Sequence, residues 1–126
     1  SYSDDLRTWT YAGRADAGEN VTVIRQGGAY LMFHSPKNGI GVKRAPRPDR
    51  WGPDEDWLTL GQASWPWAQG RLTAATVLDL TDEPRVRKYL MIVHGSTKAG
   101  LARHPAHGEA SLALAWSDDL KTWTWP

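Results

Sequence analysis

Hydrophobic residues in this chain occur in short runs that are separated by glycine, proline and small polar residues. The run at 21–24 is followed by Gln26-Gly27-Gly28 and by a second run at 30–34, which is the pattern of a β-hairpin. No longer segment has a helical period, so we predict an all-β fold. Further strands are predicted at 40–43, 57–60, 72–80, 89–93 and 111–116.

An internal repeat accompanies this pattern. The phrase Ser-Asp-Asp-Leu-x-Thr-Trp-Thr occupies 3–10 and 117–124, and a degenerate copy lies at 45–51. The three tryptophans that fix the register are 42 and 72 residues apart, which fits one propeller blade and one blade lengthened by loops. A second phrase, at 29–35, returns at 88–96 in the same order. We expect each Ser-Asp-Asp-Leu phrase to form a tight turn that its tryptophan pins to a sheet.

Composition narrows the classes of function. The 126 residues are 40% hydrophobic and 23% charged, which is typical of a folded domain. Because 15 basic and 14 acidic side chains nearly balance, neither a nucleic-acid partner nor a membrane is indicated. The absence of cysteine excludes disulfides and thiolate metal sites. The unusual feature of the composition is its eight tryptophans, which could pack in a core or stack on the rings of a ligand.

The chain contains, in order, a strand, a Gly-Gly turn, Tyr-Leu-Met-Phe-His-Ser, Gly-Ile-Gly-Val and the Ser-Asp-Asp-Leu phrase. The order of these segments resembles the blades of five-bladed propeller glycosidases. This superfamily surrounds glycoside hydrolase families 43, 32 and 62. The resemblance implies four-stranded antiparallel blades that form part of a five-bladed β-propeller. On this resemblance, residues 1–18 are the end of one blade and residues 19–64 are a complete blade. Residues 65–126 are a further blade with a long loop at 97–109.

The resemblance also implies that this chain is a partial propeller. Five blades need about 200 residues or more, so we expect missing blades, or self-association, to cover the open sheet edges. The alternative is a small complete β-sandwich. The Ser-Asp-Asp-Leu phrase is also similar to the Asp-box of sialidases, but that motif has a glycine and a longer step to its tryptophan, so we rank it second.

The resemblance implies that the complete propeller hydrolyses furanosides or related plant and algal glycans with inversion, using two carboxyl groups. On this resemblance Glu19, at the start of a predicted strand, is the candidate general acid, although Val21 stands where the family has proline. The alternative for Glu19 is a solvated turn residue. The catalytic base would belong to an earlier blade, so this chain alone is expected to be inactive. Asp16 is a poorer partner, because neighbouring turn residues rarely face opposite sides of a sugar.

The segment at 65–74 is the most unusual stretch of the chain, with two tryptophans, an amide and a guanidinium before a buried strand. Aromatic faces stack on sugar rings and arginine donates several hydrogen bonds, so these side chains are candidate carbohydrate contacts. Alternatively, the tryptophans fill the gap between blades. His34 is also a candidate contact, but its repetition as His94 favours a shared structural role. The predicted substrate contacts are Arg71, Trp67, Gln69, Trp65 and His34.

No cofactor or metal site is predicted. His104 and His107 have a spacing that could bind a metal, but no third ligand accompanies them. The resembled enzymes sometimes hold an axial calcium or sodium ion, which no residue here specifies. Asp54 is interpreted as a surface charge. The resemblance slightly favours a secreted or periplasmic location. The rival function is a non-catalytic carbohydrate-binding or self-assembling module that uses its tryptophans as stacking platforms.

Overall fold

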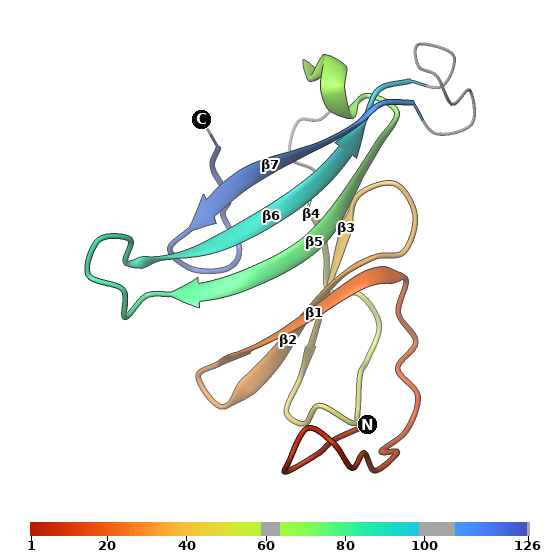
Figure 1. Cartoon of the computed structure of the whole chain (residues 1–126), viewed down its shortest axis with the longest axis vertical. Helices are drawn as coiled ribbons and strands as arrows, with labels where there is room; N and C mark the ends of the chain where they lie inside the picture. The colour runs from red at the N-terminus through yellow and green to blue at the C-terminus, as the bar shows by residue number, and fades with distance from the viewer. Residues whose placement is uncertain (59–63, 99–107, 126) are drawn as a thin grey trace.

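The chain folds into two antiparallel sheets (Figure 1). The computed structural model describes residues 1–58, 64–98 and 108–125. The first sheet has the order β1-β2-β3-β4 and the second the order β5-β6-β7. The strands are β1 (Glu19–Gln26), β2 (Ala29–Ser35), β3 (Ile40–Ala45), β4 (Asp56–Leu58), β5 (Arg71–Leu80), β6 (Lys88–Ser96) and β7 (Ala110–Ser117), and a short 3₁₀ turn, η2 (Pro66–Ala68), precedes β5. This confirms the all-β prediction, and the sheets are compatible with blades.

Local sequence explains the strand boundaries. Between β1 and β2, Gly27 and Gly28 have φ angles of 53° and 83°, and two consecutive positive φ angles are what a tight hairpin turn requires. Each predicted strand overlaps an observed one, and the observed strands generally extend a residue or two further. The predicted strand at 57–60 corresponds to β4, and its last two residues lie outside the described part of the chain.

The core lies between the two sheets, where β1 packs against β5. Side chains alternate along each strand, so one face of each sheet points into this core. The first sheet contributes Ile24, Leu31, Phe33, Ile40 and Val42; the second contributes Leu72, Ala74, Val77, Met91 and Val93. Figure 1 shows the amino-terminal segment lying away from the second sheet.

Hydrogen bonds between the sheets fix where β5 begins. The backbone N–H of Leu72 donates to Asn38 Oδ1 at 2.9 Å, and the N–H of Gly39 donates to the carbonyl oxygen of Leu72 at 2.8 Å. The N–H of Ala74 donates to Ser35 Oγ at 3.1 Å. The β2–β3 turn of the first sheet therefore holds the first residues of β5 in place.

The carboxy-terminal turn at 117–124 covers the core side of the first sheet. Leu120 is 1% exposed and Trp123 is 9% exposed. The Trp123 ring meets Phe33 of β2 edge-on, with centroids 5.8 Å apart and planes at 87°. The predicted pinning of a turn by its tryptophan is therefore observed at this copy of the repeat.

Candidate functional site

Two equivalent strand starts meet at one end of the interface between the sheets. Glu19 is the first residue of β1 and Arg71 is the first residue of β5, so each opens the first strand of its sheet. Glu19 is paired with Ser35 at the end of β2, and Arg71 is paired with Ser96 at the end of β6. The two sheets therefore present these side chains from corresponding positions.

A glycine precedes each of the two residues, and the packing requires it. A Cβ atom on Gly18 would lie 2.1 Å from the carbonyl oxygen of Ser35, and one on Gly70 would lie 2.1 Å from the carbonyl oxygen of Thr97. No side chain fits at either distance, so the backbone before each strand passes directly against the neighbouring strand end. This close approach fixes the positions from which Glu19 and Arg71 project.

Glu19 and Arg71 form an ion pair across the two sheets, with Arg71 Nη2 2.7 Å from Glu19 Oε2. The Glu19 side chain is 71% exposed and that of Arg71 is 42% exposed, so water reaches both charged groups. They line a shallow depression with Ser35, Pro36, Lys37 and Asn38. The structure thus brings together the predicted acid and the predicted principal substrate contact.

The chemistry of this depression is polar and mixed in charge. Lys37 and Arg71 provide two cations, and Glu19 is the one carboxylate that lines the depression within the described residues. A carboxylate accepts hydrogen bonds from hydroxyl groups, while guanidinium and ammonium groups donate to hydroxyl oxygens. The depression therefore presents both hydrogen-bond acceptors and donors to the same ligand.

His34 occupies a buried position behind the start of β1. Its side chain is 2% exposed, and its Nδ1 accepts a hydrogen bond from the Gly18 N–H at 2.9 Å. Nε2 therefore carries the proton, which it donates to Asp54 Oδ1 at 2.5 Å, and Lys43 Nζ lies 3.6 Å from the same oxygen. Both polar atoms of the ring are used within the protein. His34 thus supports the backbone next to Glu19 rather than offering a polar atom to a ligand.

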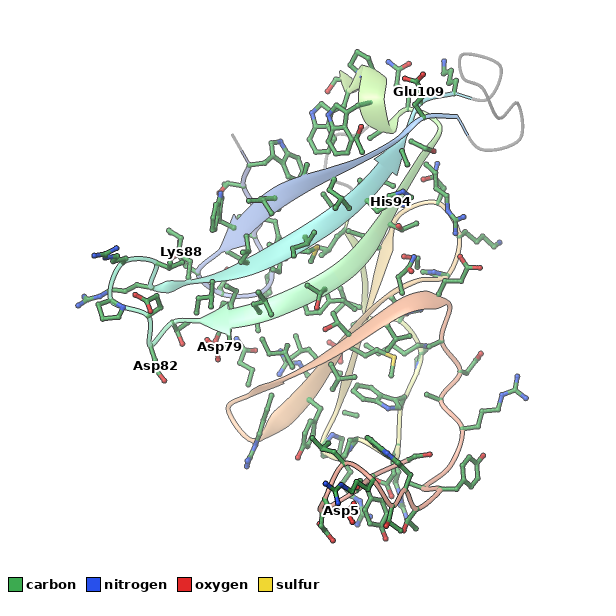
Figure 2. The ribbon with its side chains drawn as sticks, viewed as in Figure 1. Asp5, Asp79, Asp82, Lys88, His94 and Glu109 are labelled. Carbon is green, nitrogen blue, oxygen red and sulfur yellow. The ribbon has the colours of Figure 1, made fainter. Side chains whose placement is uncertain are left out.

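The interpretation of Asp54 as a surface charge is wrong. Its side chain is only 25% exposed, and it is the partner of the buried His34. Twenty residues separate the two in the chain, and no local pattern joins them. The repeated histidine has different surroundings: His94 on β6 lies 3.4 Å, through Nδ1, from Thr73 Oγ1 (Figure 2).

The predicted tryptophan contacts lie elsewhere. Trp67 lies within η2 and Trp65 directly precedes it. Both line a separate hollow with Trp116 and Trp125, not the depression around Arg71. Along the chain, the end of the 3₁₀ turn and the exposed Gln69 separate both tryptophans from the start of β5. The five predicted contacts therefore do not form one site. Arg71 lines the depression, the two tryptophans line the hollow, Gln69 follows η2 and His34 is buried.

Within the described ranges there is no group of three or more histidine, aspartate or glutamate side chains placed to hold a metal ion. His104 and His107 lie outside those ranges. In the described part of the chain, no helix is both long and apolar enough to span a membrane. Searches of protein-family models, of curated proteins and of solved structures find no match to this chain.

Proposed function

We propose that the depression around Glu19 and Arg71 binds a carbohydrate. The observation that carries this proposal is the exposed ion pair formed by the first residues of two equivalent strands. A sugar presents adjacent hydroxyl groups that both donate and accept hydrogen bonds. Glu19 supplies acceptors and Arg71 supplies donors only a few ångströms apart, so one pair of neighbouring hydroxyls can satisfy both side chains.

Binding accounts for these residues better than hydrolysis does. Glycoside hydrolysis needs a protonated carboxyl group and a second, ionised carboxyl group on the other side of the scissile bond. Among the described residues the depression offers only one carboxyl group, that of Glu19, and Arg71 Nη2 already donates a hydrogen bond to it at 2.7 Å. A carbohydrate-binding role requires neither a second carboxylate nor a proton on Glu19.

The test is a calorimetric titration with arabinan oligosaccharides, which are furanosides. Replacing Arg71→Gln removes the charge and several donors, and we expect binding to weaken by about tenfold or more, the effect of losing a hydrogen bond to a charged group. The matched control is Arg47→Gln, because Arg47 forms an exposed ion pair with Asp49 at 2.9 Å and does not line the depression. Equal affinity of the two variants, or failure of the unmodified chain to bind, would contradict the proposal.

Hydrolysis is the second candidate, favoured by one observation: Glu19 is a solvent-accessible carboxylate at the start of a first strand, as the resembled enzymes place their acid. The chain and its Glu19→Gln variant are compared for release of nitrophenol from 4-nitrophenyl α-L-arabinofuranoside. The binding proposal predicts no release by either protein. Release by the unmodified chain that the variant abolishes would instead favour the hydrolase.

A further inference from the structure

A second hollow lies on the second sheet, separate from the depression around Glu19. It has a volume of about 340 Å³, within the range of about 300–1,000 Å³ that is common for small-molecule sites. Four indole rings and three aliphatic side chains line it, and none of these also lines the depression. The lining residues are Trp65, Trp67, Trp116 and Trp125 with Val93, Ala113 and Leu114.

The aromatic wall of this hollow is held in place by its neighbours. Trp65 and Trp67 stack with centroids 5.2 Å apart and planes at 8°, and Trp125 meets Trp65 edge-on at 4.1 Å and 81°. Trp67 lies against the backbone of Gly95 on β6, where an added Cβ would come within 2.4 Å of the indole ring. A wall fixed in this way loses little conformational entropy when a ligand binds.

The lining selects the chemical class of the ligand. It contains no charged side chain and no side-chain hydrogen-bond acceptor, so a sugar would leave its hydroxyl donors without side-chain partners. Within the described residues, none of the four lining indoles donates its N–H to a protein acceptor, whereas those of Trp51 and Trp123 donate to backbone carbonyls. Flat apolar walls with N–H donors suit a planar ring that carries an acceptor.

We propose that the hollow binds a neutral aromatic ring with a hydrogen-bond acceptor on its edge. The ring packs against the indoles in stacked or edge-on geometry, and its acceptor receives an indole N–H. This site is independent of the carbohydrate proposal, since the two share no residue and differ in the polarity of their lining.

The test uses acetophenone, a neutral aromatic ring whose carbonyl oxygen accepts but cannot donate a hydrogen bond, as the probe. The indole N–H signals of the tryptophans in two-dimensional ¹⁵N–¹H NMR spectra are the reporters. The expected result is a saturable shift of the signals of the four lining tryptophans, while those of Trp9, Trp51 and Trp123 stay in place. L-Arabinose at the same concentrations is expected to leave all these signals unchanged. Absence of a saturable shift with acetophenone, or an equal response to arabinose, would overturn the proposal.

A matched pair of variants on one strand provides the second test. Leu114 lines the hollow and is 41% exposed, whereas Leu112, two residues earlier on β7, is 69% exposed and does not line it. Leu114→Glu puts a carboxylate at the apolar wall and is expected to weaken acetophenone binding by about tenfold or more. Leu112→Glu is expected to leave binding unchanged. Equal binding by the two variants would show that the hollow is not the site.

Discussion

The two full copies of the Ser-Asp-Asp-Leu turn have the same backbone geometry. In the first, Asp5 Oδ1 accepts hydrogen bonds from the N–H groups of Arg7 at 2.8 Å and Thr8 at 2.7 Å. In the second, Asp119 Oδ1 accepts the equivalent bonds at the same two distances, from Lys121 and Thr122. Leu6 and Leu120 are both left-handed, with φ of 60° and 65°. Each turn also joins two short extended segments through one β-bridge.

Their surroundings differ completely. Leu6 is 78% exposed and Trp9 is 58% exposed, whereas the equivalent Leu120 and Trp123 are 1% and 9% exposed. The second copy rests on the first sheet, while the first copy lies at the end of the molecule marked by Asp5 in Figure 2. Short polar side chains are therefore sufficient to specify the turn, and a neighbouring sheet determines whether its apolar residues contribute to the core.

The largest difference in stability is expected between variants of the two tryptophans. Trp123→Ala removes a buried ring that contacts Phe33 and should lower the free energy of unfolding by about 3–5 kcal/mol. Trp9→Ala should change it by about 0.5 kcal/mol or less, because the side chain is mainly in water. Urea unfolding followed by far-ultraviolet circular dichroism measures both values. Similar losses for the two variants would show that the first turn also packs on a sheet.

The two leucines should respond to glycine with opposite signs. Leu120→Gly loses buried apolar surface and should destabilise the protein by about 2–5 kcal/mol. Leu6→Gly loses little burial and relieves the left-handed backbone, so its turn should gain about 0.5–1 kcal/mol after the entropic cost of glycine. Amide hydrogen exchange at Thr8 measures the first turn, and urea unfolding measures the second. Faster exchange at Thr8 in Leu6→Gly would contradict this prediction.

The smallest expected effect is the loss of turn stability at low pH. Hydrogen bonds from the backbone N–H groups of Thr8 and Arg7 lower the pKa of Asp5 from 3.8 to about 2, and the equivalent bonds from Thr122 and Lys121 lower the pKa of Asp119. Since each folded-state pKa is lowered, the stabilisation of each turn is complete above about pH 4 and is lost as the pH falls, and for the Asp5 turn the loss is centred near pH 2. The Thr8 amide signal should therefore titrate near pH 2.

A variant separates charge from hydrogen bonding in this titration. Asp119→Asn keeps an acceptor oxygen but has no carboxyl group, so the Thr122 amide signal should lose its response below pH 4 while that of Thr8 keeps it. An unchanged response of Thr122 in this variant would mean that another group titrates there.

Much of the fold follows from local sequence. The alternation of hydrophobic and polar residues, the Gly27-Gly28 turn and the Ser-Asp-Asp-Leu phrases predict the strands and turns, because each depends on residues close together in the chain. The burial of Trp123 but not Trp9 does not follow, since their local sequences are nearly identical. That difference depends on which sheet lies beside each turn.

The candidate site was only partly predictable for the same reason. The sequence predicts Glu19 and Arg71 separately, each from its position at a strand start, but their ion pair depends on how the sheets pack. A usable signal was present: each follows a glycine at the start of the first strand in its sheet. The separation of Trp65 and Trp67 from Arg71 could not be seen, because it depends on the 3₁₀ turn at η2.

The central claim is that the two sheets pack as equivalent units, with the second turn resting on the first sheet. Nuclear Overhauser effects between aromatic protons test this directly, because they detect protons within about 5 Å, close to the separation of packed aromatic rings. We predict strong cross-peaks between Trp123 and Phe33 and none between Trp9 and Phe33. A missing Trp123–Phe33 cross-peak in the folded protein would contradict the account.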